Sequence, residues 1–271
     1  MRHIKITIAY DGADFHGWQN QPGMATIQGA IGDAARTITQ ENVQIHGASR
    51  TDAGVHALAQ VAHFKTQSAL PAPEFQRALN ALLPPAIRII AAEEVGPDFH
   101  SRWQAQAKTY RYRIYRGHVL PPFEHRRALH YSGPLDEQAM AAAAREFQGE
   151  HDFTSFAASS GSEDEDRERD MVRLIYSSEI ICDLEREEIA YLVRGRSFLR
   201  YMVRKIVGTL IEVGKGRLAS AEIAQSFKLR DRSRCGPTVP PEGLYLVAIE
   251  YPDPTDSLAF FAHTRRARAR T

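Results

Sequence analysis

Residues 1–12 read MRHIKITIAYDG, and the pattern they set decides how the rest of the chain folds. Ile4, Ile6 and Ile8 alternate with Lys5 and Thr7, so that one face of an extended segment is apolar and the other is polar. A period of two residues is typical of a β-strand that is buried on one face. The chain therefore begins with a strand that needs a hydrophobic layer on one side only.

Outward from this strand, strands and helices alternate. Thr26 is a candidate N-cap for a helix with apolar residues at helical spacing, and Pro73 opens a second helix that the Pro84-Pro85 pair closes. The predicted order of the first half is β-α-β-β-α-β. Its elements are strand 3–9, helix 27–38, strands 43–46 and 60–64, helix 73–83 and strand 87–95.

The second half repeats this order without an obvious repeat of residues. Its predicted elements are strand 106–116, helix 136–147, strands 172–182 and 189–194, helices 199–213 and 220–228, and strand 244–251. Two such units predict an α+β protein of two ferredoxin-like (β-α-β-β-α-β) units, with antiparallel sheets side by side and a substrate cleft between them. We expect domains at 1–104 and 105–251, followed by a basic tail at 252–271.

The composition is that of an ordinary globular protein. Hydrophobic residues make up 43% and charged residues 25% of the 271 positions, enough for a real core. Two cysteines, Cys182 and Cys235, are too few for a disulfide framework. The N-terminus lacks the apolar stretch of a signal peptide, and no run approaches the ~20 apolar residues that cross a bilayer. We expect a soluble cytoplasmic protein.

The charges are unevenly distributed although their sum is only +1. Basic residues gather in 108–116 (KTYRYRIYR), 194–205 (RGRSFLRYMVRK) and the end of the tail, and they are interleaved with aromatic residues in the first two runs. An acidic run within residues 159–170 offsets them and is predicted to be a mobile loop. Local basic stripes with aromatic residues are typical of a protein that holds RNA along one face.

The segment 47–56 (GASRTDAGVH) concentrates ionisable residues between two predicted strands. An aspartate in such a loop is more often a turn or capping residue than a catalyst. Arg50 and His56 flank Asp52, so acid–base and metal-binding interpretations are both open, and His63 could join a metal site. The local pattern does not choose between them.

Two further stretches offer candidate residues. In the strand 106–116, Tyr110 shares a face with Tyr112, where tyrosines more often pack than react. In the helix 199–213 the apolar residues form one broad arc, with Arg200 and Arg204 at its edge. An arginine at such an edge can lay its stem on the core and direct its guanidinium group to a carboxylate.

Ordered segments along nearly the whole chain resemble the bacterial tRNA pseudouridine synthase A (TruA) family. The resemblance is carried by YDG at 10–12 with FHGWQ at 15–19, residues 47–60 with RTDAGVHA intact, FHSR at 99–102 leading to YRY at 110–112, HDFTSF at 151–156, FL at 198–199 with MVR at 202–204, and GPT at 236–238. Six segments in order are far more specific than any single one. Met171 departs from the threonine that is common at its position, a change we interpret as a variation in packing.

The resemblance implies a pseudouridine synthase fold and the isomerisation of uridine to pseudouridine at positions 38, 39 and 40 in the anticodon stem-loop of tRNA, without cofactor or metal. By similarity, Asp52 is the catalytic nucleophile, and Arg204 pairs with it and lowers its pKa. Tyr110 stacks on the target base, and Arg50 holds the flipped nucleotide. The resemblance also implies a homodimer with tRNA crossing both subunits. Two alternatives from other classes are a non-catalytic RNA-binding protein and a metal-dependent hydrolase using Asp52, His56 and His63.

Overall fold

The computed structural model describes residues 1–158 and 170–252. The elements of the first half are β1 (Arg2–Tyr10), α1 (Ile27–Thr39), β2 (His46–Gly47), β3 (His56–Thr66), α2 (Ala72–Leu82) and β4 (Ile87–Val95). This order is the predicted one, and Thr26 caps α1 by accepting a hydrogen bond from the Gly29 amide. The prediction of a strand over 43–46 is wrong, because β2 begins only at His46. The Ile45 carbonyl accepts its hydrogen bond from the Gln28 side chain instead of from a strand.

The second half has more elements than the sequence predicted. They are β5 (Ala107–Tyr115), β6 (Leu129–His130), α3 (Glu137–Arg145), β7 (Gly149–Asp152), β8 (Val172–Asp183), β9 (Glu188–Gly195), α5 (Met202–Gly214), α6 (Ser220–Leu229) and β10 (Leu244–Glu250). The short strands β6 and β7 were not predicted. Helix α5 begins three residues later than predicted because Tyr201 has a left-handed backbone, with φ of 63°, that a helix cannot include.

The strands of the described residues form one ten-stranded sheet. Its order is β4-β1-β3-β10-β5-β9-β8-β7, with β2 beside β3 and β6 beside β5. The pairs β3–β10 and β5–β6 are parallel and the others are antiparallel. The prediction of two separate antiparallel sheets is therefore corrected to one mixed sheet. Tyr245 and Leu246 of β10 pair with the start of β3, which satisfies backbone groups that two inner sheet edges would leave open.

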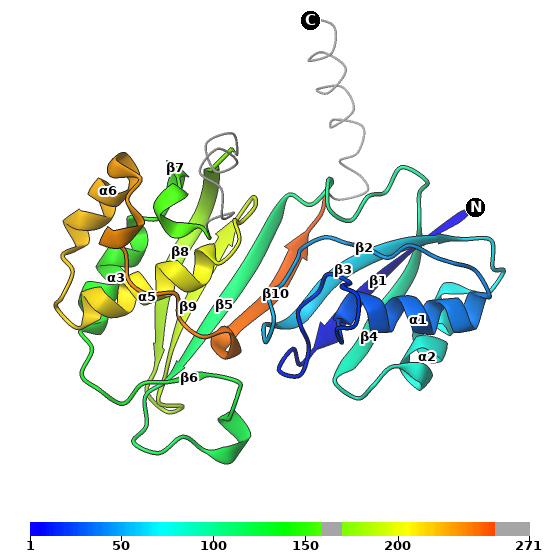
Figure 1. Cartoon of the computed structure of the whole chain (residues 1–271), viewed down its shortest axis with the longest axis horizontal. Coiled ribbons are helices and arrows are strands. Elements are labelled where there is room, and N and C mark those ends of the chain that lie inside the picture. The colour runs from blue at the N-terminus through cyan, green and yellow to red at the C-terminus, as the bar shows by residue number, and fades with distance from the viewer. Residues whose placement is uncertain (159–169, 253–271) are drawn as a thin grey trace, which may run out of the picture.

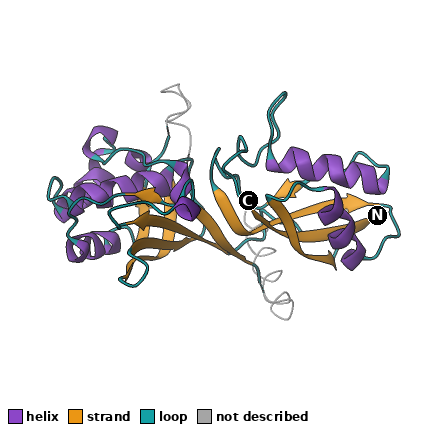
Figure 2. Cartoon of the chain, turned by 90° about the horizontal axis from the view of Figure 1, so that it is seen from below, coloured by secondary structure: helices purple, strands orange, loops and turns teal. Residues whose placement is uncertain are grey.

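The helices of residues 1–158 and 170–252 cover the same face of this sheet, in two groups (Figure 2). Helices α1 and α2 lie over the strands of the first half, and α3, α5 and α6 lie over those of the second half (Figure 1). Ile4, Ile6 and Ile8 are fully buried beneath the first group, as the alternation in residues 1–12 predicted. Tyr110 and Tyr112 of β5 are buried on the helix-covered face as well. Strand β5 thus brings Tyr110 to the part of the sheet between the two helical groups.

Several expectations concern parts of the chain away from the sheet. The acidic run and the basic tail lie outside the described residues, apart from Asp170 and the first residue of the tail. Both cysteines are free, and Met171 is buried in the core. Within residues 1–158 and 170–252, the structure has no helix of the length and apolarity needed to span a membrane.

Candidate functional site

The loop of residues 48–55, between β2 and β3, carries Asp52 and is held by backbone contacts. The Thr51 carbonyl accepts a hydrogen bond from the Trp18 amide at 3.0 Å, and the Gly54 amide donates to the Phe15 carbonyl at 3.2 Å. The Thr51 hydroxyl lies 2.8 Å from the hydroxyl of buried Tyr10. These contacts fix the loop on both sides of Asp52, so that its carboxylate has a defined position.

Two arginines lie beside the Asp52 carboxylate: Arg204 in the first turn of α5 and Arg200 just before this helix. Arg204 Nη1 is 3.6 Å from Asp52 Oδ2, and Arg200 Nε is 3.9 Å from Oδ1. At these distances the contacts are ionic rather than direct hydrogen bonds. The Arg204 side chain is only 13% exposed, whereas that of Arg200 is 65% exposed. Solvent therefore screens Arg200 more strongly, and Arg204 is the stronger electrostatic partner of Asp52.

Tyr201 positions both arginines. Its left-handed backbone costs a residue with a side chain about 1–2 kcal/mol. The guanidinium carbons of Arg200 and Arg204 lie 4.7 and 4.9 Å from the centre of its ring. Arg204 Nε also donates to the Val239 carbonyl at 2.8 Å. Cation–π stacking and this hydrogen bond hold the guanidinium groups near Asp52, and they offset part of the backbone strain.

The pKa of Asp52 reflects two opposed effects. Burial raises it above the usual value for an aspartate, and the charges of Arg204 and Arg200 lower it only in part. The lowering expected from Arg204 is therefore present, but the effect of burial is larger. Only 23% of the Asp52 side chain is exposed, so loss of hydration outweighs two arginines that make no direct hydrogen bond at these distances. The charges of the two arginines favour the ionised carboxylate and offset part of this cost.

Tyr110 of β5 completes the cluster through a contact with Ser49 of the same loop. Its hydroxyl lies 2.8 Å from Ser49 Oγ, and the Phe198 ring meets its ring edge-on at a centroid distance of 5.0 Å. Gln60 fixes Ser49 by accepting from its amide and donating to its carbonyl. Burial, with a further contribution from the Asp52 charge, raises the pKa of Tyr110 to about 12. The phenol is therefore neutral at pH 7 and can donate a proton.

Comparisons with known proteins identify the family of the chain. Residues 6–104 and 143–252 match the family described as tRNA pseudouridine synthase. The chain belongs to this family. The Solibacter usitatus protein named tRNA pseudouridine synthase A is 49% identical, over 93% of this chain and 100% of the relative. The proteins of the same name from Acetivibrio thermocellus and Limosilactobacillus fermentum are 44% and 42% identical, covering 93% and 95% of this chain and 100% and 99% of the relative.

The structure of this tRNA pseudouridine synthase family member brings three of the four predicted site residues together. Asp52, Arg204 and Tyr110 form one cluster, as described above. Arg50 lies two residues before Asp52 but is exposed, and among the described residues it forms no hydrogen bond or ion pair. An unengaged guanidinium group two residues from Asp52 is available to a ligand.

The histidines that the sequence left open as ligands are engaged elsewhere. His56 Nδ1 lies 3.1 Å from Asp11, and its Nε2 lies 3.0 Å from the Arg126 carbonyl. His63 Nδ1 lies 2.9 Å from the Ser101 hydroxyl. Within residues 1–158 and 170–252 there is no group of three or more histidine, cysteine or acidic side chains arranged to hold a metal ion. The donor set of a metal-dependent hydrolase is therefore not assembled around Asp52.

Ser49 and Gln60 belong to the cluster but were not predicted as site residues. Ser49 gave no local signal, because its partner Tyr110 is distant in the sequence. Gln60 did give one, since a glutamine on the helix-covered face of a largely apolar strand needs buried hydrogen-bond partners. The sequence placed Arg200 at the edge of the apolar arc but did not assign it a role.

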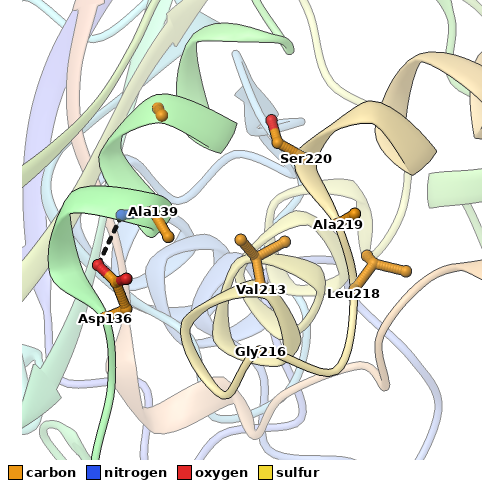
Figure 3. A pocket seen from close by; sticks show the side chains of 8 residues that line it. Asp136, Ala139, Val213, Gly216, Leu218, Ala219 and Ser220 are labelled. Atoms are coloured by element: carbon orange, nitrogen blue, oxygen red, sulfur yellow. Dashed lines mark hydrogen bonds between the residues drawn. The ribbon is translucent and has the colours of Figure 1, made fainter.

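The cavity shown in Figure 3 is separate from this cluster. It has a volume of about 360 Å³ and lies between α3 and the segment that connects α5 to α6. Its walls include Val213, Leu218 and several alanines, and its acidic side chain, Asp136, caps α3 by accepting from the Ala139 amide. The only titratable side chain that lines this cavity is thus already engaged, so the cavity has no group free for acid–base chemistry.

Proposed function

We propose that this protein is an isomerase that converts uridine to pseudouridine in tRNA, at positions 38, 39 and 40 of the anticodon stem-loop. The observation that carries the proposal is the cluster itself. It holds a largely buried carboxylate, Asp52, beside two guanidinium groups and close enough to the neutral phenol of Tyr110 to raise its pKa. Membership of the tRNA pseudouridine synthase family supports the same reaction.

The reaction moves atoms only within the substrate. The bond between uracil N1 and ribose C1′ breaks, the base turns while it stays bound, and a bond forms between C5 and C1′. The hydrogen on C5 leaves as a proton, and N1 gains a proton. Nothing is oxidised and no group is imported, so the proposed reaction uses no cofactor.

Each residue of the cluster has a distinct role in this proposal. Asp52 acts as the nucleophile, toward the sugar or the pyrimidine ring, and must be ionised to do so. Arg204 supports the ionised form, since burial alone would favour protonation. Tyr110 stacks on the target base and handles a proton. Arg50 holds the nucleotide after it leaves the helical stack, a step that costs a few kcal/mol.

The assay that tests the proposal is the release of tritium from tRNA labelled with [5-³H]uridine, because tritium leaves C5 only when the new bond forms there. We expect release by the wild type and by Asp33→Ala, which changes an exposed aspartate of α1. We expect no release by Asp52→Ala although it still binds tRNA. Release by Asp52→Ala at the wild-type rate would show that the protein does not use this carboxylate, and absence of release by the wild type would favour a non-catalytic RNA-binding protein.

The same proposal extends to the organisation of the protein. The strands divide in the sheet as they do in the sequence, with β4-β1-β3 from residues 1–104 and β10-β5-β9-β8-β7 from residues 105–251. We propose these ranges as two ferredoxin-like domains, with the substrate entering a cleft between their helical groups and 252–271 as a basic tail. We also propose a cytoplasmic homodimer that binds tRNA across both subunits. Sedimentation velocity at micromolar concentration tests the dimer, and a single monomer peak would contradict it.

A further inference from the structure

The connection between β4 and β5, residues 96–106, is fixed to the strand that leads into the Asp52 loop. Ser101 at its centre is fully buried, and its hydroxyl donates to the His46 carbonyl of β2 at 2.7 Å. The His63 ring and the Tyr251 hydroxyl contact Ser101 as well, at 2.9 and 2.6 Å. Strand β2 ends at Gly47, directly before the loop of residues 48–55. The connection 96–106 and the Asp52 loop therefore hold fixed positions relative to each other.

This connection presents an exposed indole. Trp103 is 78% exposed, and one face of its ring stacks on the His100 ring at a centroid distance of 3.9 Å and an angle of 11°. His100 is itself held in the turn, because its Nδ1 accepts from the Arg102 amide and its carbonyl accepts from the Gln104 amide. One face of the indole is thus supported by a ring, and the other is open to solvent.

Two exposed cations lie near this indole. The charges of Arg102 and Lys65 both act on the His100 ring on which Trp103 stacks. Burial, and to a smaller extent Lys65, lowers the pKa values of His46 and His100, so these rings are mainly neutral at pH 7. The charge of the patch therefore comes from Arg102 and Lys65.

Lys108 links the patch to the loop that carries Asp52. Arg102 adds to the effect of burial on Lys108, and together they lower the pKa of Lys108 to about 8. Lys108 Nζ donates to the Ala48 carbonyl at 2.7 Å, at the start of that loop. Lys65 is five residues after Gln60 in β3 and therefore lies on the face of the sheet opposite the helices, so the patch is a contact outside the reaction centre.

The chemistry of the patch matches one kind of occupant. A flat aromatic face beside two cations suits an unpaired nucleobase with its flanking phosphates, because every base can stack and every phosphate is anionic. We propose that Trp103 is a stacking platform for an unpaired base of the RNA substrate outside the reaction centre, with the nearby cations Arg102 and Lys65 attracting the phosphates of that RNA. This inference rests on the proposed function for the identity of the RNA.

Intrinsic fluorescence tests the platform directly, because the chain has two tryptophans and the other, Trp18, is only 1% exposed. We expect acrylamide to quench Trp103 strongly in the free protein and much less after unmodified tRNA is added. Trp103→Phe supplies the Trp18 background. If acrylamide quenches Trp103 equally with and without tRNA, the platform is ruled out. If raising the protein concentration without tRNA shields it while a dimer forms, a second copy covers the patch and the proposal is overturned.

Binding measurements complete the test. Trp103→Ala should raise the Kd for tRNA about tenfold, the effect expected for one lost base stack, and Trp103→Phe should restore most of the affinity. Leu184→Ala, which changes an 86% exposed residue in the turn between β8 and β9, is the matched control and should bind as the wild type does. A wild-type Kd for Trp103→Ala would overturn the proposal. Since these measurements record binding, a failure of the platform is distinguishable from a failure of the reaction, which tritium release reports.

Discussion

The hydroxyl oxygens of Ser49 and Tyr110 lie 2.8 Å apart, joining the loop that carries Asp52 to the strand that carries the phenol. The same geometry occurs once more, in the core of the second half, where the hydroxyls of Ser178 and Tyr191 also lie 2.8 Å apart. Both tyrosines are buried. Only the Ser49–Tyr110 pair belongs to the Asp52 cluster. Comparing variants of the two pairs therefore distinguishes the contribution of the Ser49–Tyr110 hydrogen bond to catalysis from its contribution to stability.

Replacement of Ser49 by alanine should slow the reaction. Without its partner the Tyr110 hydroxyl loses its orientation toward the substrate, so we expect kcat to fall several-fold and the free energy of unfolding to fall by about 1 kcal/mol. Ser178→Ala should lose similar stability, by denaturant unfolding, but keep the wild-type kcat for tritium release. Equal effects of the two changes on kcat would mean that the Ser49 bond has only a structural role.

Replacement of Arg204 by methionine should impair catalysis more than tRNA binding. Met keeps the apolar contacts of the stem but removes the less exposed of the two charges beside Asp52, so we expect kcat to fall roughly 10²-fold, as for other lost electrostatic partners. Arg200→Met should lower kcat only a few-fold, since that side chain is 65% exposed and screened. Single-turnover tritium release and filter binding measure the two effects. If Arg204→Met reacts normally, the proposed pairing with Asp52 is wrong.

The raised pKa of Asp52 predicts how stability depends on pH. A raised folded-state pKa means that the folded protein binds this proton more tightly than the unfolded chain does. The wild type therefore loses stability as the pH rises from the unfolded pKa of about 3.9 through the folded one. Asp52→Asn removes the loss of stability that comes from ionising Asp52. The variant should be inactive, yet more stable than the wild type at pH 8. This difference in stability should shrink at pH 4. Denaturant midpoints at both pH values measure this, and a variant less stable than the wild type at pH 8 would contradict it.

The sequence predicted those parts of the fold that depend on local periodicity. The alternation of Ile4, Ile6 and Ile8 is enough to specify a strand buried on one face, and the apolar arc of 199–213 is enough to specify α5 and to leave Arg204 at its edge. The parallel pairing of β10 with β3 could not be predicted in this way. It joins segments from opposite ends of the chain, and neither segment carries a local mark of its partner.

For the candidate site too, the sequence predicted some residues and missed others. The family resemblance named Asp52, Arg204 and Tyr110, and the structure brings all three together. Ser49 was missed because its role depends on a contact that only the folded chain makes. The arginine that lowers the pKa of Asp52 was expected from the motif, but the larger effect of burial was not, since the degree of burial depends on the folded chain.

Gly17 offers a test of how strictly the Asp52 loop must be placed. Its φ is +89°, and a Cβ at this position would lie 2.6 Å from the Thr51 carbonyl oxygen and 3.0 Å from the Asp52 carbonyl carbon. Both atoms belong to the backbone, so Gly17→Ala must move the loop. Gly23 has a similar φ of +74° but nothing within 4 Å of its Cβ position.

Gly17→Ala and Gly23→Ala should therefore both lose about 1 kcal/mol of stability from the unfavourable φ, but only Gly17→Ala should lose activity. Because a displacement of about 1 Å can cost 10²-fold in rate, we expect at least a tenfold fall in single-turnover tritium release for Gly17→Ala and none for Gly23→Ala. Unfolding curves for the two variants provide the stability control. A Gly17→Ala enzyme that reacts at the wild-type rate would mean that the loop tolerates displacement, and that the position of Asp52 is set by the arginines of α5 rather than by the Thr51 contacts.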